Sequence, residues 1–243
     1  MSEGVVAVVT LVCEGDTDVA ILSALAEALV PGDVIVDCVQ PERPLDRAAQ
    51  YGELWSGWEG VRRWCRRQCE RFGDLAAAMS QPPLAGSQAV VVHIDADVAD
   101  PDRLNCRKDC PPPEDTADVL RDVLLCWCNA RAAPPRVVLC IPSKAIEAWV
   151  YAALCAHHDL NGEWLECRDG PESLLAGLPG KPKLVRRERQ PAPKGASRRW
   201  RKVPDAYRTA APRVAQAWPR VCKVCTQAER FDRELRAALG SPA

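Results

Sequence analysis

The stretch "VVAVVTLVCEGDTD" (Val5–Asp18) decides the fold. Val5–Cys13 is a run of β-branched and other apolar residues, which is typical of a buried strand. The residues after it, up to Val30, place apolar side chains near helical spacing, and Thr17 or Asp16 is the expected N-cap. The stretch therefore predicts a strand followed directly by a helix, with carboxylates at the junction: Glu14, Asp16 and Asp18.

The same alternation continues along the chain. Further strands are predicted at Val34–Val39, Gln88–Ile94 and Arg136–Pro142, and helices at Trp58–Met79, Thr116–Ala130 and Lys144–His157. Strands that alternate with helices indicate βαβ units, so we expect an α/β fold with a mainly parallel sheet flanked by helices. Residues 1–160 would form this domain. Residues 161–243 would add a basic loop and a C-terminal helical extension, with helices near Val203–Trp218 and Lys223–Leu239, packing on the same domain.

Acidic residues follow three of the predicted strands. Glu14 follows the first, Asp95 and Asp97 follow the third, and Glu147 lies one helical turn beyond the fourth. Parallel sheets hold their ligand sites outside the carboxyl ends of the strands, so these side chains can meet in one crevice. For Glu147, an outward position in water is the alternative to one aimed at the cluster.

Carboxylates that lie close together raise one another's pKa unless a cation compensates. All-oxygen sites suit Mg²⁺ or Mn²⁺, and such ions can activate water for phosphodiester cleavage. The alternative is that these acids are helix N-caps and solvated loop groups. That alternative is favoured for Asp16 and Asp18 taken alone, and the metal site is favoured for Glu14 together with Asp95 and Asp97.

Three motifs resemble a known family. "EGDTD" (14–18) and "HIDAD" (93–97) resemble the Glu-Gly and DxD motifs of the Toprim domain, and "IPSKAIEAWVYAAL" (141–154) resembles the ExW segment of stand-alone Toprim proteins related to OLD nucleases and RloB-like proteins. The resemblance covers roughly residues 5–154. A weaker match continues through "GKPKL", "RKVPDAYR" and "ERFDRELRAAL".

This resemblance implies a Rossmann-like Toprim fold and Mg²⁺- or Mn²⁺-dependent cleavage of DNA or RNA. It implies metal ligation by Glu14, Asp18, Asp95, Asp97 and Glu147, with Asp100 a looser match, and charge stabilisation by Lys183. It further implies a role as effector in prokaryotic antiphage defence with an ABC- or AAA-type ATPase. That ATPase would be a separate subunit, because the chain has no GxxxxGK[ST] loop.

A basic segment, Lys181–Lys202, is the second functional candidate. It has ten lysines and arginines and one acid, a net of +9, so the remainder of a chain whose total is −1 has −10. Its aromatic ring could stack on a base, and its cations could contact phosphates. The expected nucleic-acid-binding residues are Arg198, Arg199, Trp200, Arg201 and Lys202; a solvated basic loop is the alternative.

The 13 cysteines are expected to be reduced thiols, with Cys13, Cys38 and Cys140 filling the core. A structural zinc site remains a weaker alternative, because the candidate pairs Cys65/Cys69, Cys106/Cys110 and Cys222/Cys225 do not form two well-spaced knuckles.

The chain of 243 residues starts without a signal-peptide pattern and has no apolar run long enough for a membrane span, so we expect a cytoplasmic protein. Two further functions stay open. The chain could be a non-catalytic Toprim-fold binding or regulatory subunit of an ATPase complex. Primase- or topoisomerase-like chemistry is a third possibility, although a catalytic tyrosine is hard to assign among Tyr51, Tyr151 and Tyr207.

Overall fold

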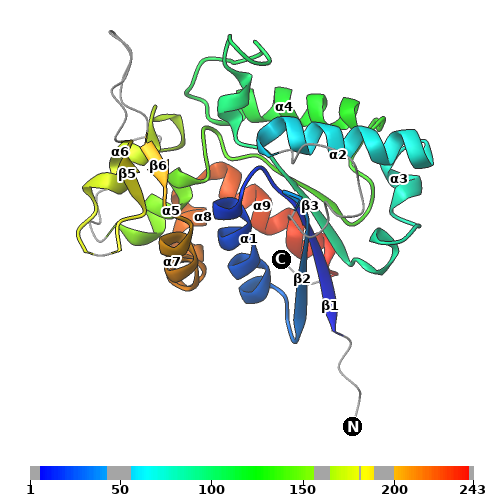
Figure 1. Cartoon of the computed structure of the whole chain (residues 1–243), viewed down its shortest axis with the longest axis horizontal. Helices are drawn as coiled ribbons and strands as arrows, with labels where there is room; N and C mark the ends of the chain where they lie inside the picture. Colours follow the sequence, from blue (N-terminus) through cyan, green and yellow to red (C-terminus); the bar gives the residue numbers. More distant parts are fainter. Residues whose placement is uncertain (1–5, 43–55, 156–164, 181, 189–199, 241–243) are drawn as a thin grey trace.

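The fold is built on a four-stranded parallel sheet (Figure 1). The computed structural model describes residues 6–42, 56–155, 165–180, 182–188 and 200–240. In these ranges the strand order is β2–β1–β3–β4, with β1 at Ala7–Val12, β2 at Val34–Gln40, β3 at Ala89–His93 and β4 at Val137–Cys140. The predicted α/β class with a parallel sheet flanked by helices is confirmed.

The inner strands are apolar on both faces because helices cover both. Every residue of β3 and β4 is buried. The side chains alternate between two hydrophobic clusters, so Val9 and Leu11 of β1 face one cluster and Val12 faces the other. This two-sided burial explains why the sequence shows continuous apolar runs.

One face is covered by α1 (Asp16–Leu29), α5 (Glu147–Leu154) and the C-terminal helices. Those helices are α7 (Pro204–Gln216), α8 (Trp218–Val224) and α9 (Thr226–Ala238). The other face is covered by α2 (Gly57–Phe72), α3 (Leu75–Ala78) and α4 (Glu114–Trp127) (Figure 1). Because α7 packs on α1 and α9 on β4, the C-terminal part shares the core of the sheet domain. The expected domain boundary at 160 lies outside the described residues.

Several predicted helix ends were wrong for local reasons. The expected helix Trp58–Met79 is two helices, because Gly73 adopts φ +95° after α2, a conformation that favours glycine. The expected helix Lys223–Leu239 breaks where Cys225 is extended between α8 and α9. The N-cap of α1 is Gly15, not Thr17 or Asp16.

The basic segment is not wholly a loop. Val185–Arg187 (β5) and Trp200–Lys202 (β6) pair as an antiparallel ladder, which was not predicted because each strand has only three residues. The hairpin follows α6 (Pro171–Gly177). Three short 3₁₀ turns complete the described elements: η2 at Leu84–Gly86, η3 at Ala96–Ala99 and η4 at Leu165–Cys167.

The cysteines differ from the expectation at one pair. Cys110 and Cys167 form a disulfide, with Cα atoms 5.4 Å apart, so the prediction of reduced thiols throughout is wrong there. Cys13 and Cys140 are buried, as the core assignment requires, and Cys38 is partly buried. Among the described residues, no helix is both long and apolar enough to cross a bilayer.

Candidate active site

Acidic side chains gather where the two central strands end. Glu14 follows β1 and Asp95 follows β3, and these strands are neighbours in the sheet. The backbone N–H of Asp95 donates to Glu14 Oε1 at 2.8 Å. The parallel pairing of β1 and β3 therefore places both acids at one edge of the sheet, as their positions in the sequence predict.

Asp95 connects this edge to the start of α5. Its Oδ1 accepts the backbone N–H of Ile146 at 2.9 Å, and His93 Nε2 lies 3.4 Å from the same oxygen. Burial alone would raise the pKa of Asp95, but His93, Lys202 and the Ile146 N–H favour the ionised form more strongly and lower it. The neighbours of Asp95 therefore hold its carboxyl group in the ionised form.

Glu147 points inward from the first turn of α5 and is fully buried. Its Oε1 accepts a hydrogen bond from Tyr207 Oη at 2.8 Å and pairs with Lys202 Nζ at 2.8 Å. Its Oε2 is buried with no hydrogen-bond partner among the described residues. Of the two positions considered for Glu147, the structure thus has the one aimed at the cluster.

Asp18 joins the cluster while it closes the N-terminus of α1. Its Oδ2 accepts the backbone N–H of Gly15 at 3.0 Å, and its Oδ1 lies 3.9 Å from Lys202 Nζ. Burial is the main cause that raises the pKa of Asp18, and Lys202 opposes the shift. Asp18 therefore serves as a capping residue and also adds negative charge to the site.

Two of the acids are held in a partly protonated range. Burial, with Asp95 adding to it, raises the pKa of Glu14 to about 8. Burial also raises the pKa of Glu147 to about 7, although Lys202 opposes that shift. These carboxyl groups gain from any added positive charge, because a cation favours the ionised form that burial disfavours.

Asp97 lies at the rim rather than inside. It is half-exposed and its Oδ1 accepts from Arg103 Nη1 at 2.8 Å. Burial and the neighbouring Asp95 raise its pKa to about 6. Asp100, the looser family match, pairs with Arg107, which also bonds Asp169 at 3.0 Å. The outer acids are thus neutralised by arginines of the loop that follows η3.

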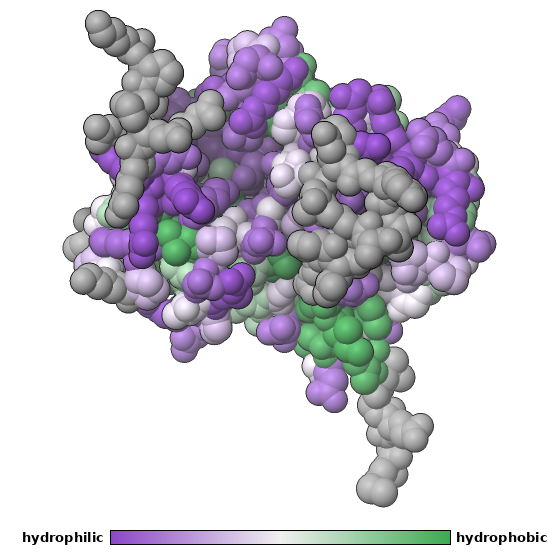
Figure 2. All heavy atoms as spheres, in the orientation of Figure 1, coloured by the Kyte–Doolittle hydropathy of each residue, from purple (hydrophilic) through white to green (hydrophobic). Residues whose placement is uncertain are grey.

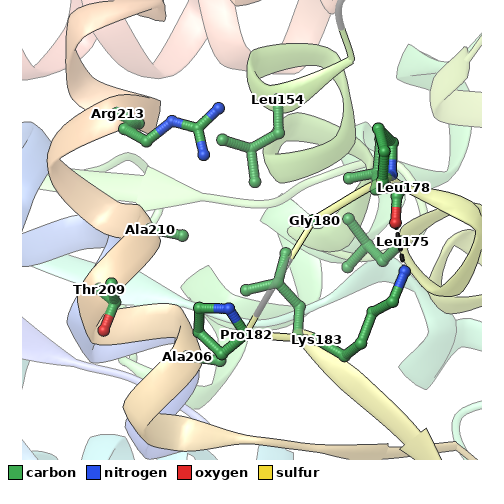
Figure 3. Close-up of a pocket in the computed structure, with 12 residues that line it drawn as sticks. Leu154, Leu175, Leu178, Gly180, Pro182, Lys183, Ala206, Thr209, Ala210 and Arg213 are labelled. Carbon is green, nitrogen blue, oxygen red and sulfur yellow. Dashed lines mark hydrogen bonds between the residues drawn. The ribbon is translucent and has the colours of Figure 1, made fainter.

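The side chain of Lys183 lies in a different environment from the acidic side chains. Its Nζ donates to the backbone carbonyl of Leu178, with Ala176 O at 3.5 Å, so it binds the C-terminal end of α6 (Figure 3). It lines a cavity of about 140 Å³ whose other walls include Leu154, Leu175 and Arg213. Among the described residues, Lys183 makes no ion pair with the acidic cluster, whereas Lys202 pairs with two of its acids.

The structure describes three of the five residues predicted to bind nucleic acid, and their side chains lie in different environments. Arg198 and Arg199 lie outside the described residues. Arg187 stacks over the Trp200 ring at 5.1 Å, and Arg201 is exposed. Lys202 points the other way, into the acids, and their charge raises its pKa well above the usual value although burial opposes this. The ammonium of Lys202 therefore acts as an internal counter-ion.

Sequence reasoning missed three members of the site: His93, Tyr207 and the inward role of Lys202. His93 lies two residues before Asp95 and is completely buried. Neither ring nitrogen makes a hydrogen bond of good geometry among the described residues, although Nε2 lies at ion-pair distance, 3.4 Å, from Asp95 Oδ1. Burial alone would lower its pKa, but Asp95 and the other acids raise it to about 9. A histidine inside an apolar strand was an available signal. The weaker family match "RKVPDAYR" (201–208) contains both Lys202 and Tyr207, but it does not indicate their long-range partners.

The acidic side chains offer the oxygen ligands that a divalent metal prefers. They are not, however, already arranged around one position that an ion could occupy. All the acids offer hard oxygen ligands, and the unpartnered Oε2 of Glu147 is a buried atom that a cation would satisfy. Within the described ranges, no group of three or more His, Cys, Asp or Glu side chains is placed to hold a metal ion. Lys202 supplies the positive charge instead.

The surface of the molecule is hollowed on the face drawn in Figure 2. Figure 2 shows a hydrophilic recess between the side of the molecule that bears α6, β5 and β6 and the side that bears α4.

Comparison of the chain with protein-family models, curated proteins and solved structures gives no match. The functional proposal therefore rests on the geometry of the described residues.

Proposed function

We propose that this protein is a divalent-metal-dependent nuclease that hydrolyses phosphodiester bonds of DNA or RNA. The observation that supports the proposal is the convergence of Glu14, Asp95 and Glu147 from three elements onto one edge of a parallel sheet. Such a concentration of buried acids is costly without a ligand, and perturbed carboxyl groups of this kind gather at functional sites.

Glu14, Asp95 and Glu147 would hold Mg²⁺ or Mn²⁺ after their side chains move closer together, because none of the described groups is already placed to hold a metal ion. Asp18, which is buried beside Lys202, and Asp97 at the rim would lie next to them. When bound, such an ion supplies activation of a water and stabilisation of the leaving oxygen. The chain's own groups orient these ligands: the Ile146 N–H and His93 fix Asp95, and the Asp95 N–H fixes Glu14. Lys202 and Tyr207 hold one oxygen of Glu147 and leave the other free to bind.

The test is cleavage of end-labelled single-stranded and duplex DNA and RNA with Mg²⁺ or Mn²⁺. Glu14→Gln should abolish cleavage, because it removes a ligand charge with little change in volume. Glu27→Gln on the exposed side of α1 is the matched control and should cleave as wild type does. Cleavage by Glu14→Gln at the wild-type rate would contradict the assignment.

A second function is favoured by one observation: Lys202 already neutralises Glu147 and Asp18 in the structure. A site with its own internal cation needs no metal, which suits a non-catalytic binding or regulatory subunit. Titration calorimetry distinguishes the two functions, since the nuclease should bind Mn²⁺ in a manner that depends on Glu14 and Glu147. A chain that binds no Mn²⁺ and melts at the same temperature with and without it would be the non-catalytic subunit.

The cellular setting of the proposal rests on the family resemblance. It comprises a cytoplasmic location, a role in antiphage defence and a separate ATPase subunit. The Cys110–Cys167 disulfide fits a cytoplasmic location poorly, because cytosolic thiols are kept reduced. The gene neighbourhood and co-purification with a neighbouring ATPase are the observations that test this setting.

A further inference from the structure

An arginine-rich face lies on α2, outside the acidic cluster. The helix buries Gly60, Val61, Trp64 and Cys65 against α3, α4 and the sheet. Its remaining surface bears Arg62, Arg63, Arg66, Arg67 and Arg71, against two acids of the helix, Glu59 and Glu70. We call these five arginines the α2 arginine face. Arg63, Arg66 and Arg71 are exposed.

Helix stability does not explain this face. Arg62 and Arg66, Arg63 and Arg67, and Arg67 and Arg71 are each four residues apart, and like charges at that spacing destabilise a helix. Within the described residues, no carboxylate lies at ion-pair distance from Arg66 or Arg71. Arg62 lies over the Trp127 ring, and its buried Nε has no hydrogen-bond partner there. Arg67 pairs with Glu42 at 2.8 Å, and Arg71 lies over the Phe72 ring at 4.9 Å. The positive charge left for an external anion is therefore that of Arg66 and Arg71.

The position of α2 relates this face to the acidic cluster. The backbone N–H of Gly57, the first residue of α2, donates to the carbonyl of Glu14 at 2.8 Å. At about 1.5 Å of rise per residue, Arg63 lies about 9 Å along the helix from that contact, and Arg71 about 12 Å beyond Arg63. A row of this length is long enough to contact more than one phosphate of a strand, since successive phosphates rise by about 3.4 Å along the axis of a duplex.

We infer that the α2 arginine face binds the sugar-phosphate backbone of a nucleic acid and leads it toward the acidic cluster. Arginine suits this ligand, because its planar guanidinium donates two parallel hydrogen bonds to a phosphate. The charge on the helix is complementary to the polymer and of the same sign as the exposed arginines of the β5–β6 hairpin. The inference deepens the proposed function, on which it rests for the identity of the polymer.

The experiment measures binding without cleavage. Fluorescence anisotropy with labelled single-stranded and duplex DNA and RNA, in EDTA, compares wild type with the double variant Arg66→Gln and Arg71→Gln at several salt concentrations. Glutamine keeps helix propensity and removes the charge. Losing two phosphate contacts should weaken binding and reduce the slope of log K against log salt by about 1.8 on duplex DNA or about 1.4 on single strands.

The matched control is the double variant Arg208→Gln and Arg233→Gln, which removes the same charge from exposed positions on α7 and α9. It should keep the wild-type slope. Equal salt slopes for wild type and the α2 variant would overturn the inference. Equal losses of binding affinity in the two double variants would overturn it as well. In either case the face would suit an acidic protein surface instead. Cleavage is measured in a separate assay. If the α2 variant loses binding but the wild-type chain cleaves no nucleic acid, the result supports the arginine face as a binding surface and counts against the nuclease proposal.

Discussion

Glu14 and Glu147 differ from ordinary surface acids because burial keeps them reluctant to ionise. The pKa of Glu14 is raised to about 8 and that of Glu147 to about 7, against about 4.3 for a solvated glutamate. The folded chain therefore binds more protons than the unfolded chain between about pH 4.5 and pH 8. Stability must fall as pH rises through this window, because the unfolded state releases its protons first.

His93 acts in the same direction. Its pKa is raised to about 9 from about 6.5, so its contribution is fully present below pH 6.5 and is lost as pH rises through 9. Asp95 acts in the opposite direction, because its pKa is lowered and its contribution is lost only as pH falls below about 4. The opposing effects are therefore separated in pH.

The prediction is that, in EDTA, the melting temperature of wild type falls between pH 6 and pH 9 more steeply than that of Glu14→Gln. The glutamine removes one group whose ionisation opposes folding. Differential scanning calorimetry of both proteins over this range measures the difference, with Glu27→Gln as the control for charge alone. Parallel profiles for wild type and Glu14→Gln would show that Glu14 titrates as a solvated acid.

At the level of single residues, the sequence predicted which acids meet but not what neutralises them. Glu14 and Asp95 follow strands that the apolar runs identify, and parallel pairing brings strand ends together. Lys202 is 55 residues from Glu147, and no local pattern distinguishes an inward lysine from the exposed Arg201 beside it. The α2 arginines were readable from their spacing of four residues, although their relation to Glu14 required the Gly57 contact.

At the scale of elements, β6 is a short strand with a large electrostatic role. Its Lys202 reaches across from the hairpin to the N-termini of α1 and α5, where it pairs with Asp18 and Glu147. The hairpin is therefore held to the sheet domain by charge as well as by packing. Periodicity could not predict this arrangement, because a three-residue strand shows no period and its ladder pairs Val185 with Lys202 across the basic segment.

Lys202→Met should destabilise the metal-free protein by about 2–3 kcal/mol. Removing one partner of a fully buried pair costs about 3–5 kcal/mol, and the Lys202 side chain is 31% exposed, which reduces the loss. Chemical denaturation in EDTA measures the change, with Arg201→Met on the same strand as a control expected to stay within about 0.5 kcal/mol. Under the nuclease proposal, Mg²⁺ or Mn²⁺ should restore more stability to Lys202→Met than it adds to wild type. Equal stabilities of Lys202→Met and wild type in EDTA would show that the pair is not formed in solution.

At the scale of the whole molecule, charge is distributed unevenly. The acids occupy the sheet edge, and arginines lie on α2 and on the hairpin, although the chain as a whole has a net charge of only −1. The parallel architecture was predictable because its strands are buried on both faces and read as apolar runs. The placement of the C-terminal helices on α1 and β4, and the pairing of Cys110 with Cys167, depend on contacts far apart in sequence, which composition and periodicity do not encode.

The Cys110–Cys167 disulfide gives a prediction at this scale. It joins the loop before α4 to η4, next to the ion pairs of Asp169 with Arg107 and Lys144. The two cysteines are 57 residues apart in the sequence, so the disulfide closes a long loop. A loop of that length corresponds to about 4 kcal/mol of stabilisation in the chain-entropy account. For a chain of this size, the loss should lower the melting temperature by about 8–16 °C.

The double variant Cys110→Ser and Cys167→Ser tests this prediction by thermal denaturation, with Cys126→Ser, an exposed free thiol, as the matched control. The double variant should melt well below wild type under oxidising conditions and close to it in excess reductant, because reduction opens the same loop in both proteins. Alkylation and mass spectrometry of the unreduced protein should leave Cys110 and Cys167 unmodified and label Cys126. Labelling of all three would mean that the two cysteines are free thiols in solution, and the ion pair of Arg107 with Asp169 would then remain between the loop before α4 and the residues after η4.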